Sequence, residues 1–220
     1  MASVETIEIE TGAKPQAAVI WLHGLGADGH DFEPIVPELD LPASPAIRFV
    51  FPHAPVRPVT LNNGYRMRAW YDIFALGGGP EDEAGIRASE LVLKQLVEAE
   101  KQKRIPASRI VLAGFSQGGA IALQTATRYP EKLAGVLALS TYLPLSGKLA
   151  AERSPANLAT PIFMAHGSYD DVIPLQRAEQ SRKLLEGAGY EVEWRTYPMP
   201  HSVCAPEISD ISAYLAKVLA

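Results

Sequence analysis

The sequence predicts an α/β protein in which helices cover both faces of a doubly wound, mostly parallel sheet. Two observations carry this prediction. Runs that favour strands alternate with amphipathic runs that favour helices almost to the end of the chain, which is the pattern of repeated β-α-β units. Several strand-like runs are apolar at nearly every position, among them AVIWLH, RIVLAGF, GVLALS and PIFMAH. Such runs suit the central strands of a parallel sheet, because helices bury both of its faces.

The same two patterns place the elements along the chain. The first segment alternates polar and apolar residues, which favours an antiparallel strand at the sheet edge. Strands are expected at 4–10, 18–23, 47–51, 109–115, 135–141, 161–166 and 191–197. Helices are expected at 81–103, 117–128, 175–188 and 206–219. Residues 52–79 are expected to form one long irregular loop, and no repeat, linker or low-complexity tract divides the chain. We therefore expect a single domain over residues 1–220.

The composition is typical of a globular protein with a substantial core. Hydrophobic residues make up 47% and charged residues 20% of the 220-residue chain. The net charge of −5 at pH 7 favours neither nucleic acid nor anionic lipid as a partner. Neither a signal peptide nor a run of apolar residues long enough to span a membrane is present. We therefore expect a soluble, cytoplasmic protein that does not insert stably into membranes.

The single cysteine, Cys204, excludes an internal disulfide and a cysteine-rich metal site. It lies three residues after His201, so a role as a reactive thiol is one alternative. Cysteine is more often a small buried filler, and we expect that role here.

The strongest local signal is Gly114-Phe115-Ser116-Gln117-Gly118, the only G-x-S-x-G in the sequence. In an enzyme this motif holds a nucleophilic serine on a strained turn between a strand and a helix, and its glycines leave room for neighbouring backbone. The flanking runs RIVLAGF and QGGAIALQTATRY supply that strand and that helix. The motif therefore predicts Ser116 as a nucleophile, with the free N–H groups of the helix N-terminus directed toward it.

A serine hydroxyl needs a base to take its proton, and in folds with this turn the chain order is serine, acid, histidine. The acid is expected just after a later strand, where PIFMAH is followed by Asp170 and Asp171; the spacing alone leaves the two open. Of five histidines only His201 follows these aspartates. It falls in a loop between the last strand and the last helix and is the predicted base. His166 ends a strand and is expected to be structural.

Residues 24–29 read GLGADG, which matches the dinucleotide-binding pattern G-x-G-x-x-G. That interpretation requires a long helix and then a strand that ends in an acidic residue. Pro34 and Pro37 interrupt the expected helix, and the next strand runs into Pro52 without an acid. The alternative is an oxyanion hole, in which the backbone N–H of Leu25 acts together with that of Gln117. Neither a cofactor nor a metal is then required.

Several motifs in order resemble the small carboxylesterases grouped with acyl-protein thioesterases and lysophospholipase-like enzymes. They are WLHGLGADG, RAWYDI, GFSQGGA, HGSYDDVIP and YPMPHSVC, and together they span nearly the whole chain. The resemblance implies an α/β-hydrolase fold without a large lid domain. It implies a triad of Ser116, Asp170 and His201, because the aspartate of the family follows His-Gly by three positions. It also implies Leu25 and Gln117 as the oxyanion donors.

The predicted activity is that of a serine carboxylesterase that hydrolyses short-to-medium acyl esters through an acyl-enzyme on Ser116. Acyl-protein thioesterase or lysophospholipase activity is the alternative within the same chemistry, so the expected partner is a small-molecule ester or acyl thioester. A catalytically silent binding protein with a hydrolase fold is the alternative of another class, and the intact serine, aspartate and histidine argue against it. The resemblance leaves a weak homodimer open, for which the sequence indicates no interface.

The loop at 52–79 holds a dense set of apolar residues. We expect Trp70, Phe74 and Leu76 to line a shallow acyl groove beside the serine; the alternative is that they only cover the sheet. Each buried methylene contributes at most about 0.8 kcal/mol, so selectivity is expected to rise over a few carbons and then level off where the groove ends.

Overall fold

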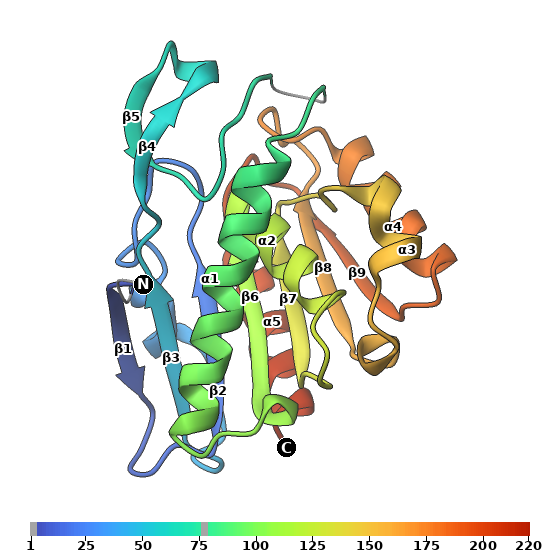
Figure 1. The fold of residues 1–220 in the computed structure, drawn as a ribbon. Helices are drawn as coiled ribbons and strands as arrows, with labels where there is room; N and C mark the ends of the chain where they lie inside the picture. Colours follow the sequence, from blue (N-terminus) through green and yellow to red (C-terminus); the bar gives the residue numbers. More distant parts are fainter. Residues whose placement is uncertain (1–3, 76–78) are drawn as a thin grey trace.

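The computed structural model describes residues 4–75 and 79–220, which form a seven-stranded sheet with helices on both faces and a separate two-stranded hairpin (Figure 1). The large sheet contains β1 (Thr6–Glu10), β2 (Ala17–Leu22), β3 (Ile47–Pro52), β6 (Ile110–Phe115), β7 (Gly135–Leu139), β8 (Ile162–Gly167) and β9 (Val192–Tyr197). Their order is β1-β3-β2-β6-β7-β8-β9. All neighbours are parallel except β1 and β3, which confirms the predicted antiparallel edge strand and the α/β fold.

The described residues form α-helices close to where the periodicity predicts them, and one short additional helix at 149–152 that was not predicted. They are α1 (Glu83–Gln102), α2 (Gln117–Ala126), α3 (Leu149–Glu152), α4 (Leu175–Gly187) and α5 (Ala205–Val218). Short 3₁₀ helices occur at η1 (Glu33–Glu38), η2 (Thr60–Asn62), η3 (Ala107–Arg109), η4 (Ser146–Lys148) and η5 (Pro155–Asn157). Among the described residues, no helix combines the length and the hydropathy that crossing a bilayer requires.

Alternate residues of the central strands point into two separate cores. On β2, Ile20 and Leu22 belong to the core that includes residues of α1 and α2, whereas Val19 and Trp21 belong to the core that includes residues of α5. Figure 1 shows α1 in front of the sheet and α5 behind it. This is why the strands are apolar at every position rather than at every second one.

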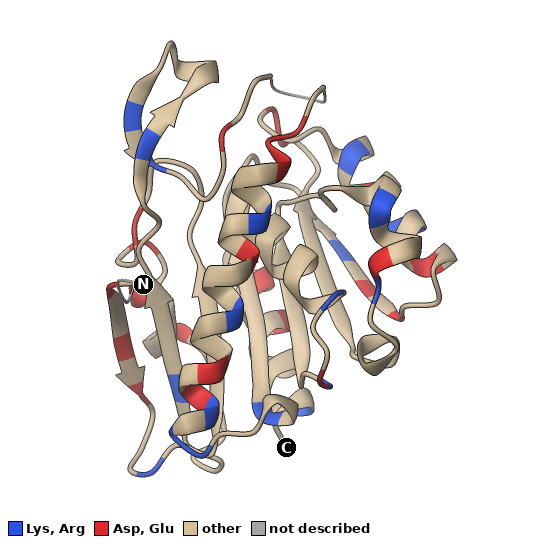
Figure 2. Cartoon of the chain, viewed as in Figure 1, with Lys and Arg blue, Asp and Glu red and all other residues tan. Residues whose placement is uncertain are grey.

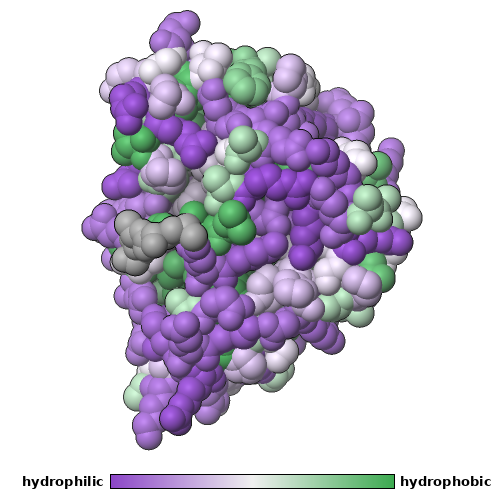
Figure 3. All heavy atoms as spheres, viewed as in Figure 1, coloured by the Kyte–Doolittle hydropathy of each residue, from purple (hydrophilic) through white to green (hydrophobic). Residues whose placement is uncertain are grey.

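The outer face of the α1 layer is polar. Figure 2 shows acidic and basic residues along α1, and Figure 3 shows that hydrophilic residues cover most of this side of the molecule, with small apolar patches between them. Asp82 caps the helix, because its carboxylate accepts a hydrogen bond from the backbone N–H of Gly85 at 2.9 Å. α1 is therefore an amphipathic helix that buries one face against the sheet.

The chain leaves β2 toward β3 on one side and returns to pair β6 on the other side of β2. This reversal makes β2 and β6 the topological switch point, and Leu22 lies opposite Gly114 in their register. In open parallel sheets, ligands bind outside the carboxyl ends of the strands at such a point. The loops after β2 and β6 are therefore the expected walls of a site.

The prediction of one irregular stretch at 52–79 is wrong in part. The chain there forms an antiparallel hairpin of β4 (Val56–Val59) and β5 (Tyr65–Arg68), which projects beyond the sheet (Figure 1). Asn63 and Gly64 adopt positive φ angles in the connecting turn. The strands are short, Pro58 lies inside the first, and three arginines interrupt them, so they lack the continuous apolar signal of the other strands.

Near the start of α5, the carboxyl group of Glu207 is fully buried. Desolvation by burial raises the pKa of Glu207 to about 8, because the surroundings oppose its ionisation. The unfolded chain does not share this constraint. The contribution of Glu207 to stability is therefore fully present below the ordinary carboxyl pKa and is lost as the pH rises toward the folded-state value.

We predict that Glu207→Gln weakens the dependence of folding stability on pH. The wild-type free energy of unfolding should fall between about pH 5 and about pH 8, by at most about 1.4 kcal/mol per pH unit from this group, and the variant should lose less. Urea unfolding of both proteins across this range measures the difference. Parallel curves for the two proteins would contradict the prediction.

Candidate active site

Ser116 lies at the turn between β6 and α2, in a backbone conformation that serine rarely adopts. Its φ is 53° and its ψ is −119°, and such strain persists only where the surroundings determine it. The two motif glycines allow the turn. A Cβ on Gly114 would collide with the backbone of Gly118, and a Cβ on Gly118 would collide with the carbonyl of Leu22. The predicted strand–turn–helix context of the G-x-S-x-G motif is therefore present.

Hydrogen bonds from the neighbouring strand hold the strained turn. The Ser116 N–H donates to the carbonyl of Leu139 at 2.9 Å, and the Thr141 hydroxyl donates to the carbonyl of Ser116 at 2.7 Å. Ser116 is only 9% exposed, and its side chain lies in the wall of a groove. Hydrogen bonds thus hold the backbone of the turn, and Ser116 borders a groove that a ligand can enter.

The structure brings Asp170 and His201 together. The Asp170 Oδ2 atom lies 2.7 Å from His201 Nδ1. Because a carboxylate only accepts, Nδ1 carries the proton, and in the neutral ring Nε2 is left as the basic nitrogen. The other oxygen of Asp170 accepts from the N–H groups of Val172 at 2.9 Å and Ile173 at 2.8 Å. The Asp170 side chain has no exposed surface, whereas Asp171 is exposed.

His201 lies next to the turn that carries Ser116. Its ring centroid lies 4.7 Å from that of Phe115, the residue before Ser116. His201 follows β9, and Asp170 follows β8, so the loops at the carboxyl ends of three parallel strands meet at one edge of the sheet. The structure therefore gathers the three residues that the sequence singles out as serine, acid and base.

His166 contacts the turn that carries Asp170, which is consistent with its expected structural role. It is fully buried, and its Nε2–H donates to the carbonyl of Ile173 at 2.8 Å. The same nitrogen lies 3.3 Å from Asp170 Oδ2. Burial lowers the pKa of His166, which favours the neutral ring. The ring and the Asp170 carboxylate thus clamp the 170–173 turn from two sides.

The two predicted oxyanion donors, Leu25 and Gln117, line the same groove as Ser116. Gln117 is the first residue of α2, and the first N–H groups of a helix have no partner within it. The Gln117 side chain is already occupied: it accepts from the N–H of Trp70 at 2.8 Å and donates to the carbonyl of Tyr71 at 2.7 Å. Only the main chain of Gln117 is available to a bound oxyanion.

His23 holds the loop that carries Leu25, a role that sequence reasoning missed. Its Nδ1–H donates to the carbonyl of Gly24 at 2.7 Å, and its Nε2 accepts from the N–H of Ala54 at 3.0 Å. Both bonds are satisfied by one neutral tautomer. Desolvation by burial lowers the pKa of His23 to about 4, so the ring stays neutral at pH 7. The only sequence signal was a histidine between a buried strand and a glycine-rich loop.

The groove beside Ser116 has a volume of about 80 Å³. Phe74 lines it as predicted and is 43% exposed. Tyr71 and Ile73, from the apolar set at 52–79, line it as well. The groove also contains residues to which the sequence assigned no role, namely Ala75, Tyr142, Val172, Ile173 and Arg177. The last four come from loops and a helix far along the chain, so no local pattern could have found them.

The other two predicted groove residues are Trp70 and Leu76. Trp70 does not lie in the groove wall: it is fully buried, and its indole N–H donates to the carbonyl of His23 at 2.9 Å. An indole needs such a partner when it is buried, so Trp70 supports the loop beneath the groove instead. Leu76 lies outside the described residues.

A family model described as phospholipase/carboxylesterase matches residues 4–219. The chain belongs to this family of α/β-hydrolases. It is 41% identical over 237 residues to an acyl-protein thioesterase 1 of Mycosarcoma maydis, covering 100% of this chain and 99% of the relative. It is 42% identical over 222 residues to an acyl-protein thioesterase 1 of Neurospora crassa, covering 94% and 89%.

A solved structure leads to the same family. The chain superimposes on Zea mays acyl-protein thioesterase 2 with a TM-score of 0.88 at 29% identity, covering 99% of this chain and 100% of that one. Membership of the phospholipase/carboxylesterase family, together with these full-length relatives, makes the protein a carboxylic ester hydrolase of the serine-hydrolase type.

We predict that Asp170→Asn and Asp171→Asn have very different effects on this hydrolase. An amide at position 170 carries no charge and can donate to Nδ1, so it neither fixes the required His201 tautomer nor stabilises the charged imidazole, and kcat should fall by up to about 10⁴-fold. Asp171→Asn changes an exposed side chain and should alter kcat by no more than a few-fold. Steady-state hydrolysis of a p-nitrophenyl ester, with circular dichroism as the folding control, compares them. The reverse ranking would assign the acid to Asp171.

Proposed function

We propose that the protein is an acyl thioesterase that removes S-acyl groups, including those carried by proteins, through an acyl-enzyme on Ser116. The observation that carries the chemistry is the strained Ser116 turn at an apolar groove, next to the hydrogen-bonded Asp170–His201 pair. The choice of a thioester is supported by relatives named acyl-protein thioesterase 1, which match nearly the whole chain.

In this mechanism Ser116 attacks the acyl carbonyl while His201 Nε2 takes the hydroxyl proton. Asp170 holds the imidazole in the required tautomer and stabilises its charged form. The N–H groups of Leu25 and Gln117 stabilise the oxyanion of the tetrahedral intermediate. His201 then protonates the departing thiol, and the acyl group remains on Ser116. Water, deprotonated by His201, attacks the acyl-enzyme and releases the carboxylic acid.

The shape of the groove is consistent with a substrate that has a bulky leaving group. Phe74 and Val172 both line the groove and are 43% and 36% exposed, so its rim is open to solvent. An acyl chain can enter such a groove while the remainder of the substrate stays outside the protein. An S-acylated peptide satisfies this requirement as well as a small ester does.

Carboxylesterase activity on short-to-medium acyl esters is the second candidate. The observation that favours it is the small volume of the groove, about 80 Å³, which accommodates only part of a long acyl chain. Both candidates use the same acyl-enzyme and differ in the leaving group and the acyl length.

A matched series of acyl thioesters and p-nitrophenyl esters, from acetyl to palmitoyl, distinguishes the two candidates. A thioesterase should show kcat/KM values for thioesters at least equal to those for esters of the same acyl group, and it should release palmitate from an S-palmitoyl peptide. A consistent preference of more than about tenfold for the esters, about 1.4 kcal/mol, would favour the carboxylesterase.

We predict that Ser116→Ala abolishes both turnover and covalent labelling by a fluorophosphonate. The loss in kcat should be several orders of magnitude, because only the oxyanion hole and substrate binding remain. Ser168→Ala, which alters an exposed serine on the acid loop, is the matched control and should still be labelled. Labelling of Ser116→Ala at the wild-type rate would disprove the assignment of the nucleophile. Wild-type protein that is not labelled at all would indicate a silent binding protein.

We also predict that Phe74→Ala reduces the dependence of rate on acyl length more than it reduces the rate on acetate esters. Each methylene that packs on Phe74 contributes up to about 0.8 kcal/mol, or about fourfold in kcat/KM. Tyr65→Ala changes another exposed aromatic residue of the 52–79 segment, outside the groove, and should leave the slope unchanged. Equal losses on acetate and octanoate esters would give Phe74 a role in the fold instead.

A further inference from the structure

One side of the acyl groove is formed by a stacked pair of residues from different parts of the chain. Tyr142 follows β7 and Arg177 is the third residue of α4. The guanidinium carbon of Arg177 lies 3.4 Å from the centroid of the Tyr142 ring. Both side chains line the groove that contains Ser116, so a positive charge lies beside its apolar residues Ile73, Phe74 and Ile173.

The same pair lines a second hollow of about 180 Å³. Glu81 also belongs to both linings, whereas Leu143, Ser181 and Leu184 belong to the second hollow alone. The stacked side chains of Tyr142 and Arg177 are therefore a partition between the acyl groove and the second hollow next to it. Without this partition, an acyl chain could continue from one into the other.

The charge of Arg177 is not neutralised by a neighbouring carboxylate. Within residues 4–75 and 79–220, no acidic oxygen lies within 4.0 Å of its guanidinium nitrogens. The acidic residues that line the groove are engaged elsewhere. Asp72 accepts two hydrogen bonds from Thr60, and Asp82 caps α1. Glu81 accepts from the N–H of Leu145 at 3.0 Å.

Hydrogen bonds hold both members of the partition in place. The hydroxyls of Tyr71 and Tyr142 are 2.9 Å apart in a buried pair. The Ser181 hydroxyl donates to the carbonyl of Arg177 at 2.8 Å and accepts from the N–H of Leu143 at 2.9 Å. This serine thus ties α4 to the segment that carries Tyr142.

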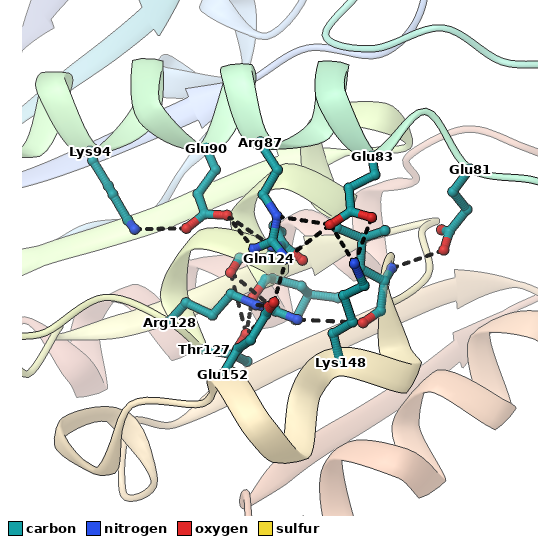
Figure 4. Close-up of polar contacts among 12 residues, drawn as sticks. Glu81, Glu83, Arg87, Glu90, Lys94, Gln124, Thr127, Arg128, Lys148 and Glu152 are labelled. Atoms are coloured by element: carbon teal, nitrogen blue, oxygen red, sulfur yellow. Dashed lines mark hydrogen bonds and ion pairs between the residues drawn. The ribbon is translucent and has the colours of Figure 1, made fainter.

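A wider polar network anchors the same segment to α1 and α2. Figure 4 shows Glu81 and Glu83 at the start of α1 directed toward the chain around Lys148, and Arg87 and Arg128 converging on Glu152. The Lys148 ammonium lies 2.6 Å from the Glu83 carboxylate, and the Arg128 guanidinium lies 2.7 Å from Glu152. Ion pairs to α1 and α2 therefore hold the segment that carries Tyr142 in place.

We propose that Arg177, stacked on Tyr142, ends the acyl groove and sets the upper limit of acyl chain length. This inference rests on the proposed function, since it concerns the acyl group that Ser116 receives. A methylene gains free energy when it is buried against apolar atoms, but burying an unpaired charge costs free energy. The benefit of a longer chain should therefore stop where the chain end reaches the guanidinium.

The central test is the substitution Arg177→Met. Methionine keeps an unbranched side chain that can pack on the Tyr142 ring and removes the charge. The ratio of kcat/KM for palmitoyl to that for butyryl thioesters should rise by at least about tenfold, the gain from two further buried methylenes. Arg177→Lys retains a charge and should keep the wild-type ratio. Reporting a ratio makes the result independent of the amount of active protein.

The matched control is Arg182→Met. Arg182 lies on the same helix with its guanidinium 5.4 Å from the Trp194 ring centroid, and it lines neither the groove nor the second hollow. This variant removes an equivalent stacked arginine, and its chain-length ratio should stay at the wild-type value. Thermal unfolding of every variant identifies any loss of folding.

Three outcomes would overturn the inference. They are an unchanged ratio in Arg177→Met, an equal rise in Arg182→Met, or a rise in Arg177→Lys that matches the rise in Arg177→Met. The last would mean that the shape of the side chain, and not its charge, ends the groove. If the proposed function is wrong, the result is different: the wild-type protein will not hydrolyse a thioester of any chain length.

Discussion

The close approach of α2 to the carboxyl ends of β2 and β6 is the constraint on which the site depends. Gly114 and Gly118 leave no room for a Cβ, since each faces backbone atoms of a neighbouring segment. This contact lets the chain reverse sharply at Ser116 and brings the N-terminus of α2 next to the loop after β2. The same tight contact thus places Ser116, Leu25 and Gln117 along one groove, which is the arrangement that the proposed acyl transfer requires.

Buried polar side chains then fix the loops around this turn. His23 and Gln117 satisfy backbone groups of the 24–71 region, and His166 does the same for the turn that carries Asp170. Buried polar groups of this kind are costly unless every bond is made, so each of them specifies one loop conformation. The lowered pKa of His23 agrees with this interpretation, because its neutral ring donates from Nδ1 and accepts at Nε2.

Among the described residues, the groove places the Arg177 guanidinium beside apolar side chains. Arg87 and Arg128 reach carboxylates in the network that braces the wall, whereas Arg177 stacks on an aromatic ring at its inner surface. A charge in that position makes part of the groove unsuitable for hydrocarbon. The segment that carries Tyr142 thus has two roles. Its ion pairs hold it to the rest of the fold, and its tyrosine, with the arginine stacked on it, limits the length of the acyl group.

By itself the sequence determined the sheet, its helices and the identity of the serine, acid and base candidates, because these depend on local periodicity and on residues within one short motif. Asp170 could be separated from Asp171 only through the resemblance to a family. The hairpin at 56–68 was not predicted, because its strands are short and are interrupted by arginines and a proline. Tertiary structure alone decided that Trp70 supports a loop and that Arg177 joins the groove. The physical reason is that a groove wall is assembled from side chains far apart in the chain, whose contacts no local pattern encodes.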